Sequence, residues 1–175
     1  RRRNLQAVEG LLEFAEGNQA VSGSRGGIVE ALTGEWRLLY TSSNAMEYNQ
    51  GLTGLANTIP NARFRGVLQR LEANGLAFDA EYEEELVVGE DTLLPVIVTS
   101  DWEVKETLSL LSGVTTVAVS VSPKQIKYGF ITVRSERWKP LRSMNLLDIA
   151  YLDGDIRVMR GQTARQNIFV FAKCL

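Results

Sequence analysis

The stretch Tyr151-Leu-Asp-Gly-Asp-Ile-Arg-Val-Met-Arg-Gly161 decides the fold class of this chain of 175 residues. It contains Asp153-Gly154, a tight-turn dipeptide, and both central positions of a two-residue hairpin turn favour positive φ. The dipeptide therefore predicts a hairpin that joins a strand over 146–152 to a strand over 155–161. A further short apolar run predicts the last strand, over 167–173.

A charged residue falls on the predicted inner face of this hairpin. Ile156 and Val158 alternate with less apolar neighbours, and Arg160 shares their face. An unpaired charge in a core is costly, so Arg160 needs a partner. We predict that the partner is Trp36, because an indole face binds a guanidinium in a cation–π contact. An up-and-down meander with 94–111 as one long strand brings both residues to the closed end of a barrel.

Trp36 belongs to a second phrase, Gly34-Glu-Trp-Arg-Leu-Leu-Tyr-Thr-Ser-Ser43. Its Gly-x-Trp form opens the first strand of lipocalin-like barrels. Together with the 151–161 stretch and Phe169-Val-Phe171, it resembles the plastid lipid-associated protein (fibrillin) family, over about residues 30 to 175. The structural residues of these phrases are Gly34, Trp36, Asp153, Asp155, Arg160 and Gly161.

The resemblance implies a mainly β protein, a lipocalin-like antiparallel up-and-down β-barrel with an N-terminal α-helix. We expect one domain over 1–175, with a helical segment over 1–32 and the barrel over 33–175. The resemblance also implies a peripheral protein of the chloroplast thylakoid or plastoglobule, or of the cyanobacterial equivalent.

Composition agrees with a folded and nearly neutral protein. Hydrophobic residues make up 45% of the chain and the formal net charge is −2, which indicates neither disorder nor a nucleic-acid partner. Apolar residues at helical spacing predict a helix over 3–20. The glycine-rich stretch 22–27 predicts a linker, and 28–32 a brief turn.

Alternation of apolar side chains predicts strands after residue 62. One of them contains Glu83-Glu84-Glu85. Adjacent residues of a strand point to opposite faces, so these carboxylates cannot converge on a metal, and we expect all three to be solvated. The strands expected between the first strand and the last three cover 64–71, 76–83, 94–100, 102–111, 115–121 and 125–134. Residues 64–71 could instead form a helical turn, and 94–100 with 102–111 form one long bent strand in the barrel count.

Catalytic chemistry is poorly represented in this chain. It has no histidine and a single cysteine, Cys174, which removes the commonest general base, the commonest metal ligand and every zinc cluster. Asp153 and Asp155 form the best carboxylate pair, but they flank a turn, where aspartate ordinarily caps the backbone. We therefore predict a protein without enzymatic activity, cofactor or metal.

An apolar ligand site is the main functional hypothesis. A barrel of eight or more strands is large enough to hold a small ligand. The long connection 44–62 is expected to be a mobile lid at the open end, because long loops in compact domains usually have a function. The candidate pocket and lid residues are Leu38, Tyr40, Met46, Tyr48, Leu52, Leu55, Phe78, Tyr82, Trp102, Tyr128 and Phe130.

A basic and aromatic segment is the second candidate surface. Trp138 lies among Arg134, Arg137, Lys139 and Arg142, a pattern that suits an anionic lipid head group or an acidic protein, or a solvated loop. The preferred function is the binding of a prenylquinone, carotenoid or lipid. The alternative is a non-catalytic docking or assembly module of a photosynthetic or biosynthetic complex, in which the protein's own side chains fill the barrel.

Overall fold

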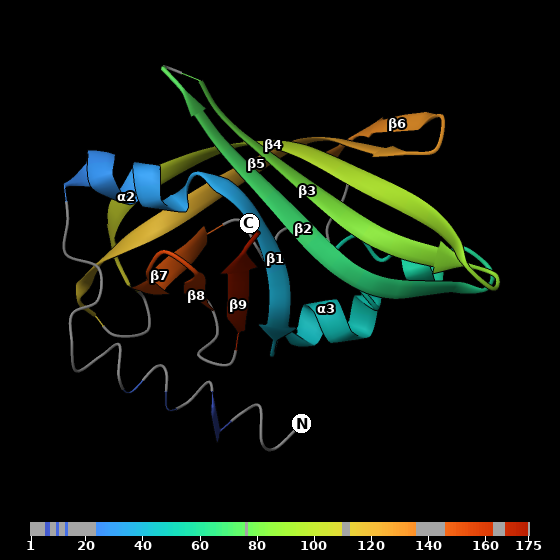
Figure 1. The fold of residues 1–175 in the computed structure, drawn as a ribbon, viewed down its shortest axis with the longest axis horizontal. Coiled ribbons are helices and arrows are strands. Elements are labelled where there is room, and N and C mark those ends of the chain that lie inside the picture. Colours follow the sequence, from blue (N-terminus) through green and yellow to red (C-terminus); the bar gives the residue numbers. More distant parts are fainter. Residues whose placement is uncertain are drawn as a thin grey trace.

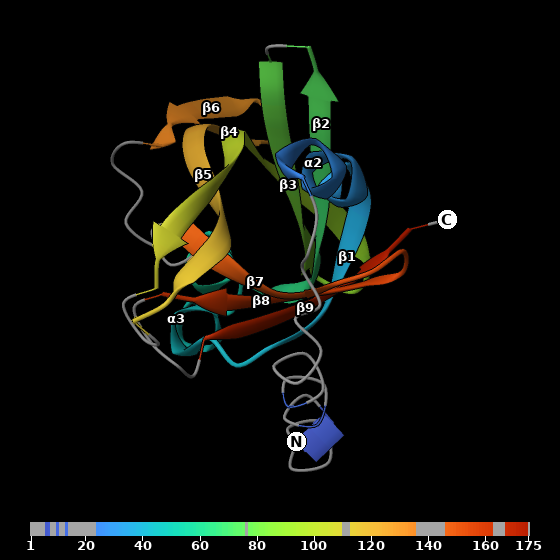
Figure 2. The ribbon, with the colours of Figure 1, turned by 90° about the vertical axis from the view of Figure 1, so that its left-hand side faces the viewer.

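The computed structural model describes residues 24–75, 77–109, 113–135, 146–162 and 167–174, together with Gln6, Ala7, Gly10 and Glu13. Antiparallel strands form one sheet in the order β4-β3-β2-β1-β9-β8-β7-β5-β6, and a further β4–β5 pairing closes eight of the nine into a barrel (Figures 1 and 2). The predicted fold class, a mainly β lipocalin-like barrel, is confirmed. The strands are β1 (Gly34–Thr41), β2 (Ala62–Asn74), β3 (Ala77–Val88), β4 (Thr92–Leu108), β5 (Thr115–Tyr128), β6 (Ile131–Arg134), β7 (Leu146–Leu152), β8 (Ile156–Gly161) and β9 (Ile168–Lys173).

Helix α2 (Arg25–Leu32) closes the end of the barrel at which β1 begins. The hydroxyl of Ser24 caps its first turn, and Ile28 and Leu32 are buried in the barrel core. The backbone carbonyl of Leu32 accepts a 2.8 Å hydrogen bond from Nε1 of Trp36. The expected linker over 22–27 and turn over 28–32 are therefore wrong from residue 25 onward, because Ser24 starts a helix there.

The connection between β1 and β2 closes the opposite end, and we call residues 44–57 the plug. It contains α3 (Asn44–Asn49) and the 3₁₀ turn η1 (Leu55–Asn57). Four of its apolar side chains join the barrel core, so the lid expected from the sequence is a packed stopper in this structure. These side chains are Met46, Leu52, Leu55 and Ala56.

Strand β5 runs without a break through Pro123. Pro123 lies between the part of β5 that pairs with β7 and the part that pairs with β6. Next to it β5 contains one extra residue, Lys124, where the β4–β5 register shifts between Thr99 and Ser100. These irregularities accommodate a residue without an N–H. The expected break between strands 115–121 and 125–134 is therefore wrong. The later strands also run opposite to the expected directions, because β7 pairs with β5 and not with β6, so β6 and β7 both run antiparallel to β5.

The true strand directions separate Arg160 from Trp36. Trp36 pairs with Lys173 at the α2 end of the barrel, whereas Arg160 pairs with Ile168 at the plug end. The turn between β7 and β8 lies at the α2 end, since β8 starts opposite Ala172. The expected contact between Arg160 and Trp36 is wrong.

The β7–β8 turn also differs from the expected type, since positive φ occurs at neither Asp153 nor Gly154. The carboxylate of Asp153 instead accepts hydrogen bonds from the backbone N–H groups of Asp155 at 2.8 Å and Ile156 at 2.6 Å. An aspartate side chain that accepts from the backbone two and three residues on stabilises a turn without left-handed residues. Asp153 also accepts a 2.6 Å bond from the hydroxyl of Tyr151.

Candidate functional site

A buried arginine occupies the α2 half of the barrel interior. The Arg157 side chain is 1% exposed, and its guanidinium carbon lies 4.7 Å from the Trp36 ring centroid and 4.4 Å from that of Phe171. The sequence pointed to Arg160 for this position. The alternation of apolar residues predicted the wrong inner face because the outer face of β8 is buried as well. Val158 packs there against Val170 in a second apolar cluster.

Two further side chains complete a polar trio inside the barrel. Nη2 of Arg157 donates to Oε1 of Gln69, and Nε2 of Gln69 lies 2.5 Å from the hydroxyl of Tyr82. Burial lowers the pKa of Arg157 to about 9, so the group is still a cation at neutral pH. Burial raises the pKa of Tyr82 to about 12. Nε of Arg157 has no hydrogen-bond partner.

Sequence reasoning missed two members of this trio. Tyr82 was among the predicted pocket residues, but Gln69 and Arg157 were not. Gln69 alternates with the buried residues Val67 and Leu71 along β2, and this period of two was the available signal.

Aromatic residues lie in another part of the interior. Phe78 and Trp102 meet edge to face, with ring centroids 5.6 Å apart and an interplanar angle of 82°. Nε1 of Trp102 donates to the backbone carbonyl of Glu72 at 2.9 Å. Leu38 and Tyr128 are half-buried and pack against the same core.

Three predicted pocket or lid side chains lie elsewhere. Tyr40 packs in the outer cluster with Val158, because the register of β1 shifts between Leu38 and Tyr40. Tyr48 is 83% exposed on α3, and Phe130 is fully exposed on the turn between β5 and β6. The expected inward orientation of Tyr40 and Phe130 is therefore wrong.

Glu84 fastens the plug to the barrel wall. Its fully buried carboxylate accepts a 2.9 Å hydrogen bond from the Thr53 N–H and another from the Thr53 hydroxyl, while Oε1 has no partner. Burial raises the pKa of Glu84 against the opposing effect of hydrogen bonds from Thr53 and Leu52. The expectation that Glu84 is solvated is wrong.

Gly51 packs directly against this carboxylate. A Cβ atom on Gly51 would lie 2.0 Å from Oε1 of Glu84 and 2.9 Å from Cδ2 of Phe64. The backbone of Gly51 has φ +139°, a conformation that glycine adopts most readily. The plug thus fits over Glu84 only because residue 51 has no side chain.

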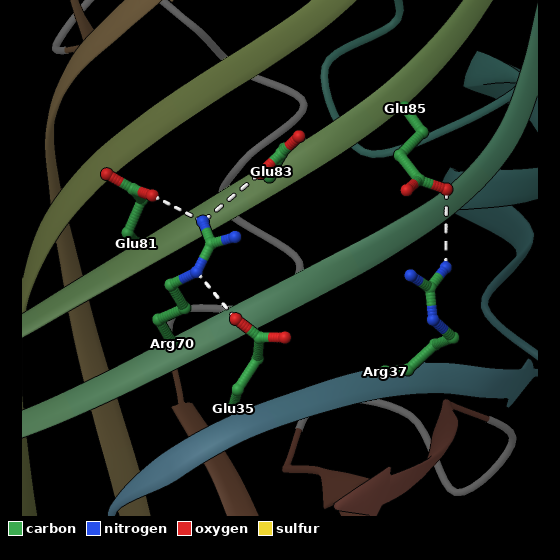
Figure 3. Close-up of polar contacts among 6 residues, drawn as sticks. All are labelled: Glu35, Arg37, Arg70, Glu81, Glu83 and Glu85. Carbon is green, nitrogen blue, oxygen red and sulfur yellow. Dashed lines mark hydrogen bonds and ion pairs between the residues drawn. The ribbon is translucent and has the colours of Figure 1, made fainter. Parts of the chain in front are cut away.

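The neighbouring glutamates face outward into an ionic network (Figure 3). Arg70 forms ion pairs of 2.8 Å with Glu35, 2.7 Å with Glu81 and 3.1 Å with Glu83. These bonds raise the pKa of Arg70 against the opposing effect of burial. The outer face over β1, β2 and β3 is therefore ionic, and a further pair joins Arg37 to Glu85 at 3.3 Å.

A groove of about 480 Å³ runs beside the plug. Met46 and Gly51 line it from the plug, and Arg63 and Phe64 line it from β2. Gly51 and Phe64 thus separate this groove from the buried carboxylate of Glu84. A ligand that entered at this end would have to displace the plug.

The described ranges contain no group of three or more histidine, cysteine, aspartate or glutamate residues that could hold a metal ion. They also contain no helix that is long and apolar enough to cross a bilayer.

Several predicted features lie outside the described residues. They are most of the helix over 3–20 and four members of the basic segment, namely Arg137, Trp138, Lys139 and Arg142. Arg134, the fifth member, is exposed at the end of β6.

These observations define a lipocalin-like closed barrel with an apolar and aromatic core and a stopper at each end. The PAP_fibrillin family model matches residues 5–172, and the chain therefore belongs to this family of plastid lipid-associated proteins, the fibrillins. No curated protein and no solved structure gives a significant match to the chain. The family is associated with plastids and lipids, and its members are generally non-catalytic.

Proposed function

We propose that this protein binds a hydrophobic small molecule, such as a prenylquinone, a carotenoid or another lipid, inside its barrel. The plug carries the proposal. Its apolar side chains are continuous with the barrel core, yet a single buried carboxylate, Glu84, fastens its backbone at Thr53. A stopper fixed at few points opens at a lower free-energy cost than a strand of the barrel.

The candidate ligand contacts come from the wall and from the plug. Leu38, Phe78, Trp102 and Tyr128 belong to or pack against the core, and Tyr82 offers a hydroxyl. Apolar and aromatic walls with a few polar groups are typical of small-molecule sites. We assign no catalytic role to any residue, and we place the protein peripherally at the thylakoid or at plastoglobules.

Hydrogen exchange at the plug tests this proposal. Backbone amides of 44–57 should exchange quickly in the free protein and at least about tenfold more slowly after addition of a prenylated quinone or a carotenoid. Helix α2, the stopper at the other end, is the internal control and should change little. Mass spectrometry of organic extracts from natively purified protein should identify a bound apolar compound.

The alternative is a docking or assembly module of a photosynthetic or biosynthetic complex. The stack of Trp36, Arg157 and Phe171 supports it, because these large side chains fill part of the interior themselves. Equal protection of 44–57 with and without the apolar compounds, together with empty extracts, would favour this alternative over ligand binding.

A further inference from the structure

The hairpin formed by β5 and β6 presents an apolar tip to solvent. Phe130 has a relative exposure of 108% and Ile131 of 52%. Gly129, with φ +55°, helps the chain to turn there. Strand β6 pairs with β5 alone, whereas β5 also pairs with β4 as far as Tyr128, so β6 is a free edge of the sheet and the turn lies at the rim of the barrel (upper right in Figure 1). A fully exposed phenylalanine next to an exposed isoleucine forms a small apolar patch that suits contact with a lipid or protein surface.

The stem of the same hairpin is basic. Residues 122–135 contain Lys124, Lys127 and Arg134 and no acidic residue. Lys124 pairs with Asp101 on β4 at 2.5 Å. Lys127 and Arg134 are exposed and form no ion pair with any residue in the described part of the chain. The stem therefore offers positive charge behind an apolar tip.

We propose that the β5–β6 hairpin inserts Phe130 and Ile131 into the head-group region of an anionic lipid surface. Lys127 and Arg134 would then lie at the depth of the phosphates, where basic residues are attracted to anionic lipids. This inference rests on the peripheral part of the proposed function and does not depend on what the barrel contains.

The insertion would orient the whole molecule. The hairpin tip lies at the plug end, since β5 ends there and Tyr128 pairs with Val96 near the start of β4. Leu93, 46% exposed on β4, lies at this same end. The plug would therefore face toward the lipid surface, and an apolar molecule could pass between lipid and barrel without crossing much water.

A protein partner that pairs with the free edge of β6 is the competing explanation. Such pairing uses backbone groups of Ile131–Arg134 and needs neither an apolar tip nor a basic stem. The tip and the charge together favour the lipid surface.

Co-sedimentation with vesicles tests the inference. The vesicles contain phosphatidylcholine alone or phosphatidylcholine with phosphatidylglycerol. Phe130→Ser combined with Ile131→Ser should reduce partitioning onto the anionic vesicles by about tenfold or more, and added salt should weaken the wild-type binding. Leu108→Ser combined with Val114→Ser is the matched control. It removes exposed apolar side chains, 60% and 57% exposed, from the β4–β5 hairpin at the α2 end, and should leave partitioning unchanged.

The inference would be overturned if both double variants lost vesicle binding equally. It would also be overturned if Phe130→Ser with Ile131→Ser left vesicle binding unchanged. Loss of a soluble protein partner without loss of vesicle binding would point instead to pairing at the β6 edge. Phe130→Trp and Leu108→Trp give a second measurement: brominated lipids should quench the added fluorescence of Phe130→Trp only. Both sites are exposed, so thermal unfolding should match that of the wild type. Ligand extraction is a separate assay, so failure of ligand binding would not be mistaken for failure of docking.

Discussion

Arg157 and Trp36 stack inside the barrel, with the guanidinium carbon 4.7 Å from the indole centroid. Phe171 covers the guanidinium at 4.4 Å, and Gln69 accepts one of its hydrogen bonds. A cation shielded by two rings keeps a favourable electrostatic contact but loses its hydration. The arginine therefore fixes the position of β8 against β1 and β9 more than it stabilises the fold.

Substitution of Arg157 should depend strongly on side-chain volume. Arg157→Ala should lower the free energy of unfolding by about 2–4 kcal/mol, because it leaves a cavity beside Trp36 and removes the donor to Oε1 of Gln69. Arg157→Met keeps most of the volume and removes the cost of a buried charge, so it should stay within about 1–2 kcal/mol of the wild type. Urea denaturation measures the free energy of unfolding of both variants, and an equal decrease in the two would contradict this account.

The buried Glu84 should make stability depend on pH. Its pKa is raised in the folded protein, so the folded state holds the proton more tightly than the unfolded chain. Stability should therefore be greatest below the ordinary glutamate pKa and fall as pH rises through the window up to the folded pKa. The slope in that window is limited to about 1.4 kcal/mol per pH unit for one proton. Glu84→Gln should flatten this part of the profile, and an unchanged slope would show that another group is responsible.

Gly51→Ala tests the close fit of the plug over Glu84. The new Cβ would overlap the carboxylate and force φ +139° on an alanine, so we expect a loss of at least about 3 kcal/mol and faster exchange at 44–57. Gly54→Ala is the control, since Gly54 has φ +81° but its nearest neighbour would be 3.7 Å away. That change should cost only about 1–2 kcal/mol. Equal effects would show that backbone conformation alone, without contact to Glu84, accounts for the loss.

Asp153→Asn should weaken the β7–β8 turn modestly. Partial burial acts to raise the pKa of Asp153, but hydrogen bonds from Tyr151 and two backbone N–H groups outweigh it and lower the pKa. A lowered pKa contributes stability above the ordinary aspartate value, which is lost as pH falls through the folded pKa. The variant should thus lose about 1 kcal/mol at neutral pH and converge with the wild type in acid.

Asp155→Asn provides the control for this turn, because the Asp155 carboxylate has no hydrogen-bond partner among the described residues. It should leave stability nearly unchanged, and neither variant should affect ligand binding. Loss of a lipid-modifying activity in either variant would contradict our prediction that the protein is not an enzyme.

The fold class was accessible from the sequence because its signals are local and repeated. Alternating apolar residues predict strands, and the Gly34-Glu-Trp36 phrase with the 151–161 stretch led to the family. The direction of the late strands was not accessible. Pro123 normally marks a strand break, and only the β4–β5 pairing shows that β5 bulges at Lys124 beside it and continues. The direction of β7 follows from its pairing with β5 instead of with β6, which no local pattern shows.

The prediction of which side chains face inward failed for a related reason. Alternation identifies an inner face only where the outer face is exposed and polar, and β8 has buried residues on both faces. Glu84 could not be separated from Glu83 and Glu85 by composition, since only strand parity turns it toward the plug. The alternation along β2 was the one local signal for Gln69, and the contact between Gln69 and Arg157 spans 88 residues of sequence.

The two stoppers and the strand between them belong to one continuous segment, residues 24–57. Within it, β1 is the strand that joins β2 to β9, and Ser42 meets Ile168 across a separation of 126 residues. Contacts this distant in sequence form slowly during folding. Docking of this segment therefore completes the barrel wall between β2 and β9 and closes both ends of the barrel. The apolar ligand that we propose would therefore enter either during folding, before this segment docks, or later at the plug.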